Sequence, residues 1–286
     1  MSVTPGGDVP GNLGDEVTGP GVFVAVRDGY DAVYAALPRS GTFSRIWRAS
    51  AYGGDFPAEF AHIGFLTTTE GRRLVDLLGL RDREVLVDVA CGTGGPGLWV
   101  AGRTGASLLG IDPPAAGLAA ARQRAAGSGL GQRARFELGT FERTGLPGGT
   151  AGGLMSIEAF QYAPDKRAAA AELFRILRPG GRLGLICFEV DPARTAGVPV
   201  LGADPVPDYA PLLEGAGFTV EAYEETPGWA ERVYAAFAAI IGAAGTLTRE
   251  MGEQAAASVV AEAMVTIQLK PYPRRILAVA RKPGPP

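Results

Sequence analysis

Short apolar runs alternate with stretches of helical periodicity through the middle of the chain, and this alternation predicts an α/β fold. One run begins at residue 85, and others cover residues 107–112, 153–157 and 182–188, while residues 135–138 are expected to form a further strand. Strands that are apolar along their whole length are typical of parallel sheets with helices on both faces. Between the strands, residues 115–126 are expected to form an alanine-rich helix, and a later helix carries Leu173, Ile176 and Leu177 inward, so the pattern indicates a doubly wound sheet.

The first apolar run ends in a glycine-rich turn within residues 85–97, and a helical pattern follows from Leu98. A strand that turns through glycines into a helix leaves free backbone N–H groups at the start of the helix. Glycine also allows a ligand to approach the bare backbone closely. The turn is therefore suited to hold a cofactor.

Two cofactor patterns fit this turn. The spacing Gly92-x-Gly94-x-x-Gly97 matches the dinucleotide fingerprint, with the acidic Asp112 about 20 residues on. Asp88 favours a different ligand, because a carboxylate there would repel a pyrophosphate but attract a sulfonium and an ammonium group. An NAD-dependent oxidoreductase is therefore the less favoured alternative.

The pattern Asp88-x-Ala90-x-Gly92-x-Gly94 resembles the first motif of class I S-adenosylmethionine (SAM) dependent methyltransferases. The string LRPGGRL, a tight turn before an apolar strand, is similar to a second signature of that family, in its small-molecule (UbiE-like, natural-product) branch. The resemblance implies a Rossmann-like methyltransferase fold, with a doubly wound, seven-stranded, mostly parallel sheet and a helical cap. Its last strand, at residues 274–280, is expected to run antiparallel.

The resemblance also implies which residues bind SAM. Asp88 is expected to help hold the amino-acid end, and Asp112 to accept both ribose hydroxyls, although Asp112 could instead cap the following helix. Thr140 stands where the family often has an aspartate for the adenine amino group, so recognition shifts toward backbone N–H groups and Phe141. The expected contacts are Asp88, Ala90, Cys91, Gly92, Thr93, Gly94, Asp112, Pro113, Thr140, Phe141, Ser156 and Ile157.

Methyl transfer requires a positioned nucleophile and, for a poor nucleophile, removal of its proton. Related enzymes often carry a histidine just after the fourth strand, where this chain has Gln161 and Tyr162. The only histidine, His62, and the acidic Glu158 are the candidate bases, and Gln161 is expected to orient the acceptor. Structural alternatives are a hydrogen-bonded helix residue for His62 and a buried strand-end carboxylate for Glu158. We expect transfer mainly by proximity and orientation.

Three parts of the chain are expected. Residues 1–26 are rich in Gly and Pro and lack an apolar period, which predicts a flexible leader. Residues 27–70 are expected to form an N-terminal helical lid, with a longer helix over residues 56–79. The SAM-binding core should span residues 71–286, with a helical cap inserted at about 229–264. Aromatic residues in the lid and cap favour an apolar acceptor pocket.

Composition limits the expected partners. The 286 residues are 47% hydrophobic and carry a net charge of −3 without a basic cluster, which argues against a nucleic-acid substrate. No apolar run approaches the roughly 20 residues of a membrane span, and no signal-peptide pattern begins the chain. Two cysteines without metal-ligand spacing favour a reduced, cytoplasmic protein with no metal site. We expect a monomer or homodimer.

The function predicted from sequence is a SAM-dependent methyltransferase of secondary metabolism that acts on a small, mostly apolar metabolite. Two alternatives retain the same cofactor motifs: a SAM-fold cyclase or isomerase without net methyl transfer, and a non-catalytic SAM-binding protein. A methylated product would separate the first function from the other two.

Overall fold

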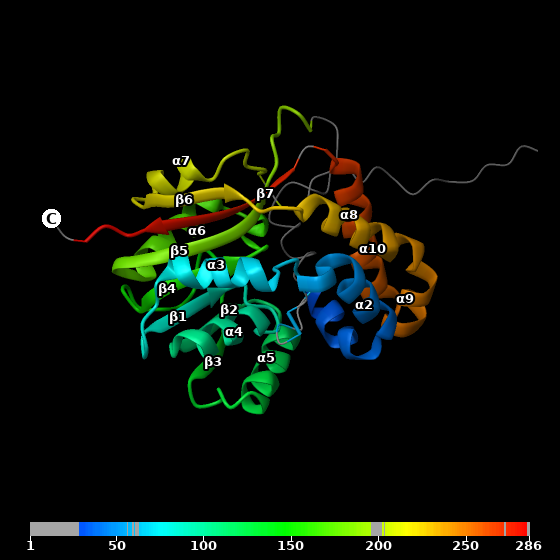
Figure 1. Ribbon diagram of the computed structural model, residues 1–286, viewed down its shortest axis with the longest axis horizontal. Helices are drawn as coiled ribbons and strands as arrows, with labels where there is room; N and C mark the ends of the chain where they lie inside the picture. Colours follow the sequence, from blue (N-terminus) through cyan, green and yellow to red (C-terminus); the bar gives the residue numbers. More distant parts are fainter. Residues whose placement is uncertain are drawn as a thin grey trace, which may run out of the picture.

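The structure, a computed structural model, describes residues 29–55, 57–58, 60, 63–195, 202, 204–271 and 273–284. The expected leader, residues 1–26, lies outside the described residues. Three clusters of buried apolar side chains organise the described part of the chain. Two of them lie on the faces of a central sheet, and the third lies within a helical layer beside it (Figure 1).

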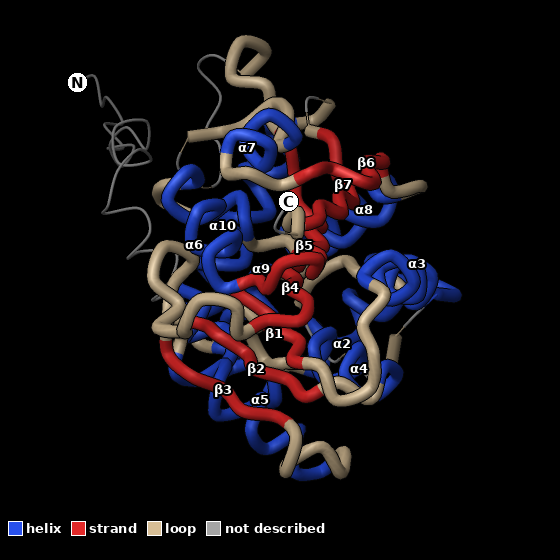
Figure 2. Tube along the Cα trace, turned by 90° about the vertical axis from the view of Figure 1, so that its left-hand side faces the viewer, coloured by secondary structure: helices blue, strands red, loops and turns tan. Residues whose placement is uncertain are grey.

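The central sheet has seven strands in the order β3-β2-β1-β4-β5-β7-β6. Their bounds are β1 (Val85–Val89), β2 (Ser107–Asp112), β3 (Ala134–Leu138), β4 (Ala151–Ile157), β5 (Leu177–Glu189), β6 (Thr219–Glu225) and β7 (Arg274–Arg281). The first five strands pair in parallel, and β7 lies antiparallel between β5 and β6. Figure 2 shows the strands as one twisted array between layers of helices. The predicted sheet, including its antiparallel last strand, is confirmed.

Helices cover both faces of the sheet. One face packs against α3 (Thr68–Leu78), α4 (Gly95–Thr104) and α5 (Ala115–Gly127), which contribute the buried Leu74, Leu98 and Leu118. The other face packs against α6 (Lys166–Ile176) and α7 (Ala210–Gly215), which contribute Leu173 and Leu213. Because β1 and β4 are covered on both sides, nearly all of their residues are buried, as the continuous apolar runs predicted.

The helical layer joins the two ends of the described chain. Residues 29–36 are helical and lead into η1 (Leu37–Arg39), α2 (Gly41–Ile46), η2 (Trp47–Tyr52) and η3 (Gly53–Asp55). The later helices are α8 (Trp229–Gly242), α9 (Ala244–Met251) and α10 (Glu253–Leu269). Figure 1 shows the blue α2 beside the orange α8 and α9, and buried residues such as Trp47 and Phe237 share one apolar cluster. We call α8, α9 and α10 the cap.

Two element boundaries differ from the sequence-based expectation. The helix expected over residues 56–79 begins only at Thr68, because Thr67 and Glu70 form a capping box that starts it there. Its predicted end is confirmed, with Gly79 in a left-handed conformation at φ 58°. Strand β5 already begins at Leu177, which pairs with Ala151 before a register shift, so the expected tight turn is an irregular strand segment.

No single helix among the described residues is both long and apolar enough to cross a membrane. The pair α8 and α9 meets the length and composition criteria together, but the two helices are bent by 76° at their junction.

Candidate functional site

A cavity lies at the carboxyl ends of β1, β2 and β4, beneath the cap and the helical residues 29–36. This is where the strand order reverses between β1 and β4, the usual ligand position in doubly wound sheets. Its floor comes from the glycine-rich turn and the strand ends, and its roof comes from both ends of the described chain. Apolar roof and wall residues include Ile63, Phe65, Phe188, Val206, Phe237 and Leu269.

Backbone conformation explains the glycines of the turn. Gly92 and Gly94 adopt φ 53° and 76°, a region that side chains disfavour. A Cβ on Gly92 would lie 2.7 Å from the Tyr34 hydroxyl, so the missing side chain makes room for the roof. Ala90 adopts φ 61° without being glycine, so this turn carries some backbone strain. The local sequence therefore fixes a tight, bare turn at the cavity floor.

Asp88 lies at the end of β1 and is 2% exposed. The backbone N–H of Gly97 in α4 donates to its carboxylate, and a Cβ on Gly97 would lie 2.6 Å from Asp88 Oδ2. Burial, together with the charge of Asp112, raises the pKa of Asp88 well above its usual range. A cationic group in the cavity would stabilise the ionised form of this carboxylate.

Asp112 ends β2 and lines the same cavity. Its Oδ2 accepts a hydrogen bond of 2.7 Å from the Gly92 backbone N–H. Burial raises the pKa of Asp112 to about 7, although this hydrogen bond opposes the shift. The structure does not use Asp112 as a helix cap: the N-cap of α5 is Pro114, and Asp31 accepts from the Ala116 N–H at 2.7 Å.

Of the expected cofactor residues, all except Gly94 and Ser156 line the cavity. Ser156 is fully buried within β4, and its hydroxyl has no hydrogen-bond partner among the described residues. Thr140 Oγ1 accepts from the Arg143 N–H at 3.2 Å. Phe141 reaches the cavity while its ring packs edge-on against Phe160. The structure therefore brings most of this set together at one place.

Among the expected catalytic residues, the two candidate bases are His62 and Glu158. His62 lies outside the described residues. Glu158 lines the cavity at the end of β4, but its carboxylate is engaged: Arg275 forms an ion pair with it at 2.6 Å, and the Phe65 N–H donates to it at 2.6 Å. Burial raises the pKa of Glu158, and the positive charge of Arg275 opposes that rise. These contacts match the structural alternative for Glu158, a buried and hydrogen-bonded strand-end carboxylate.

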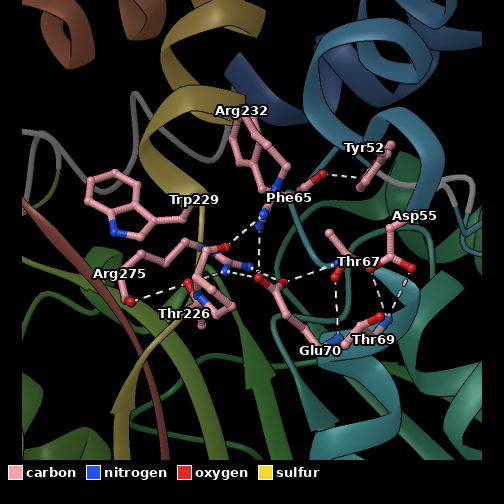
Figure 3. Close-up of polar contacts among 12 residues, drawn as sticks. Tyr52, Asp55, Phe65, Thr67, Thr69, Glu70, Thr226, Trp229, Arg232 and Arg275 are labelled. Atoms are coloured by element: carbon pink, nitrogen blue, oxygen red, sulfur yellow. Dashed lines mark hydrogen bonds and ion pairs between the residues drawn. The ribbon is translucent and has the colours of Figure 1, made fainter.

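Glu158 belongs to a buried charge network that is drawn in part in Figure 3. The Arg275 side chain is 0% exposed and also pairs with Glu70 at 2.9 Å, while it donates to the Thr226 hydroxyl at 2.7 Å. Arg232 of α8 pairs with the same Glu70 at 2.7 Å. The network thus joins α3, β7 and the cap to the cavity wall. Sequence analysis did not find it, because its members lie far apart in the chain.

Gln161 is positioned to meet a ligand. Its amide nitrogen donates to the Glu158 backbone carbonyl at 2.7 Å, which fixes the side chain. Its Oε1 is buried and has no hydrogen-bond partner within the part of the chain that the structure describes. Because Gln161 lines the cavity, this oxygen is available to accept a hydrogen bond from a bound molecule.

A second group of polar cavity residues was missed from sequence. Glu262 of α10 accepts hydrogen bonds from the hydroxyls of Tyr30 and Tyr162, each at 3.1 Å. Burial raises the pKa of Glu262, and both tyrosine hydroxyls oppose the rise. Lys166 also lines the cavity, and burial lowers its pKa. The available signal for Glu262 was a single acidic residue within the otherwise mostly apolar stretch 255–267.

Comparison with known proteins finds similarity to methyltransferases. Residues 86–181 match a family model described as "Methyltransferase domain". The chain is 26% identical over 220 residues to 27-O-demethylrifamycin SV methyltransferase of Amycolatopsis mediterranei, covering 71% of this chain and 79% of that protein. It is 32% identical over 103 residues to sterol 24-C-methyltransferase of Pneumocystis carinii, covering 36% of this chain but only 27% of that longer protein.

A solved structure extends the likeness of the fold to almost the whole chain. The [4+2]-cyclase SpnF superposes with a TM-score of 0.69 at 20% sequence identity, and the match covers 95% of this chain and 100% of that one. At this identity the match establishes a shared fold. The helical cap therefore belongs to the shared architecture together with the sheet.

Proposed function

Because residues 86–181 match a methyltransferase family model, we propose that the chain is a class I SAM-dependent methyltransferase, which binds SAM in this cavity and transfers the methyl group to a small, mostly apolar acceptor. The observation that carries the proposal is the continuity of one cavity. The same cavity reaches Asp112 and the glycine-rich turn at one side and apolar residues such as Phe188 and Phe237 at the other. Cofactor and acceptor would therefore meet inside it.

The strand-end side suits SAM. Asp112 would accept the ribose hydroxyls in charge-assisted hydrogen bonds, and the buried Asp88 would favour the cationic amino-acid end. Thr140 and Phe141 would contact the adenine. The bare backbone at Gly92 allows the cofactor to approach the turn closely. These roles remain proposals, and they rest on the shared position of the residues around the cavity.

The other side suits an apolar acceptor with few polar groups. Its aromatic and aliphatic lining would bury the body of the acceptor, while Gln161 Oε1 would accept one hydrogen bond from it. We further propose that residues 27–70 act as a lid and that the cap at about 229–264 roofs a core spanning residues 71–286. An acceptor with a diphosphate group is disfavoured, because Lys166 is the one lysine or arginine among the described lining residues, whereas the Glu262 carboxylate lines the same cavity without a cationic partner.

SAM supplies a methyl group already activated by a sulfonium, so the chain mainly has to align the acceptor in line with it. Gln161 would orient the acceptor, and the aromatic roof would exclude water from the reaction. The fixed arrangement of the wall comes from the Arg275 network, which holds the backbone of Phe65 against Glu158. Transfer in this site would therefore rest mainly on proximity and orientation.

Two measurements test the proposal. Calorimetry should detect binding of SAM and S-adenosylhomocysteine but not of NADH. Incubation with methyl-labelled SAM and a panel of hydroxylated apolar metabolites should then yield a product that carries the label. NADH binding with SAM ignored would overturn the proposal. A SAM-requiring product of unchanged mass would support the cyclase or isomerase alternative, and binding without any product across the panel would favour a non-catalytic SAM-binding protein.

A further inference from the structure

Glu262 is a cavity-lining carboxylate whose surroundings differ from those of Glu158. It is partly buried on α10, and Tyr30 and Tyr162 donate their hydroxyls to it at 3.1 Å each. Both tyrosines also line the cavity, and their rings pack edge-on with the ring centroids 6.2 Å apart. The carboxylate is therefore held by two neutral donors, one from the N-terminal helix and one from η4 (Phe160–Tyr162).

The position of Glu262 is opposite the cavity floor. Glu262, Thr266 and Leu269 all line the cavity, and their spacing places them on one face of α10. The ring centroids of Tyr30 and Tyr34 are 5.7 Å apart, and the Tyr34 hydroxyl lies over Gly92. Glu262 is thus connected through the rings of Tyr30 and Tyr34 to the turn where SAM is proposed to bind.

We propose that Glu262 contacts the nucleophilic hydroxyl of the acceptor and removes its proton during methyl transfer, with Tyr30 and Tyr162 as positioning residues. The inference rests on the proposed function. As the acceptor oxygen forms its bond to the methyl carbon, the methyl–sulfur bond breaks and its electron pair stays on sulfur. The hydroxyl proton passes to Glu262 and leaves to water after the product departs, which gives S-adenosylhomocysteine and a neutral methyl ether.

Glu262 suits this role better than Glu158. The guanidinium of Arg275 and the Phe65 N–H already engage the Glu158 carboxylate, which makes it a poor base. Around Glu262 the facing titratable groups are Tyr30, Tyr34, Tyr162 and the more distant Glu158, and none of these groups is a cation. A partly buried carboxylate without a cationic partner is a stronger base than an exposed one.

Sinefungin and S-adenosylhomocysteine form a pair of probes that needs no known acceptor. Sinefungin places an ammonium-bearing carbon where SAM has its methyl-bearing sulfonium, and S-adenosylhomocysteine lacks that group. A carboxylate within reach of the acceptor oxygen must also lie near this ammonium and attract it. The ratio of the two Kd values therefore reports whether Glu262 faces the transferred methyl group, and binding terms common to both ligands cancel.

The experiment measures both Kd values by calorimetry in the full chain, in Glu262→Gln and in Glu253→Gln. Glu253 is the matched control, because it is an exposed glutamate on the same helix. We expect Glu262→Gln to reduce the preference for sinefungin about tenfold or more, with S-adenosylhomocysteine affinity little changed, and Glu253→Gln to retain the full preference. An undiminished preference in Glu262→Gln would overturn the inference.

The pH dependence of the unsubstituted protein provides a second readout that is independent of folding in a variant. The preference for sinefungin should rise with pH as Glu262 ionises. Tyr162→Phe removes a donor to the ionised carboxylate, so it should move that rise to higher pH. A preference independent of pH would count against Glu262. Failure of the unsubstituted protein to bind either ligand would instead overturn the proposed function, and this inference with it.

Discussion

Arg275 and Glu158 form an ion pair of 2.6 Å that connects the penultimate strand of the sheet order to the wall of the cavity. The Arg275 side chain is fully buried, and the side chain of Glu158 is 7% exposed. Both charges have therefore left water: Glu158 depends on Arg275 for compensation, whereas Arg275 is compensated by both Glu158 and Glu70. The geometry of the cavity wall depends on this pair.

Loss of Arg275 should destabilise the whole fold. Arg275→Ala leaves the carboxylates of Glu70 and Glu158 with less compensation in a buried place, and we expect it to lower the free energy of unfolding by about 3–5 kcal/mol. Arg73→Ala is the control, because Arg73 pairs with Glu224 through side chains that are 50% and 44% exposed, so its loss should cost less than about 1 kcal/mol. Urea denaturation compares the two variants. Equal, small losses would show that the buried network contributes little.

Cofactor affinity should depend on pH through Asp112. Burial raises the pKa of Asp112 to about 7, and hydrogen bonds from the ribose hydroxyls would favour the ionised form. Binding below pH 7 therefore requires loss of a proton, so affinity for S-adenosylhomocysteine should fall as pH decreases, by up to about tenfold per pH unit. Affinity should level off above the pKa. Calorimetry across this range measures the slope.

Two substitutions of Asp112 test the source of that slope. Asp112→Ala should weaken binding roughly ten- to a hundred-fold at neutral pH, because charge-assisted hydrogen bonds contribute about 1.5–3 kcal/mol. Asp112→Asn should bind weakly with a much flatter pH profile. A full slope in Asp112→Asn would assign the titration to Asp88, whose pKa is also raised.

The glycine-rich turn should not tolerate a side chain at position 92. In Gly92→Ala the new methyl group would lie 2.7 Å from the Tyr34 hydroxyl at the cavity floor. We expect at least about a tenfold loss of S-adenosylhomocysteine affinity from this clash, in addition to backbone strain of about 1 kcal/mol. Gly149→Ala carries similar strain at φ 73° but has open space around the added Cβ. It should lower the melting temperature modestly and leave binding intact, and similar affinities for the two variants would contradict the argument.

Two bulky residues of α8 should separate acceptor binding from stability. Phe237 lines the cavity, whereas Trp229 packs against Phe188 and donates its indole N–H to Glu225 at 2.9 Å. Phe237→Ala should therefore raise the KM for an acceptor identified by the labelling assay, with little change in SAM affinity. Trp229→Ala should mainly lower the melting temperature. If Trp229→Ala impaired acceptor use as strongly as Phe237→Ala, the cap would act as one unit.

Local sequence was sufficient to predict the sheet and most of the cavity residues at the carboxyl ends of its strands. Strand β2 was predicted at residues 107–112 and is observed there, because its apolar run and its terminal Asp112 are both local signals. The start of α3 was misplaced by more than ten residues, although Thr67 and Glu70 carry the capping-box pattern. Apolar residues upstream, such as Phe60, pack in the core without being helical and imitated a helical period.

The polar roof of the cavity could not be predicted in the same way. Tyr30 and Glu262 are separated by 232 positions in the sequence, and only packing of the N-terminal helix against the cap brings them together. Nothing near Arg275 in sequence indicates that it will meet Glu70 and Glu158. Such contacts follow from tertiary structure, so periodicity and local motifs do not predict them.

The cavity is built from separate parts of the chain, so cofactor binding and the choice of acceptor depend on different residues. The strand-end residues that are proposed to hold SAM come from one continuous stretch of sequence, whereas the roof comes from the two flanks of that stretch. Selection or directed evolution acting on the flanks can therefore change which molecule is methylated while cofactor use is preserved. Libraries confined to the α8 and α10 positions that line the cavity should yield altered product profiles in catalysts that still saturate at the original SAM concentration.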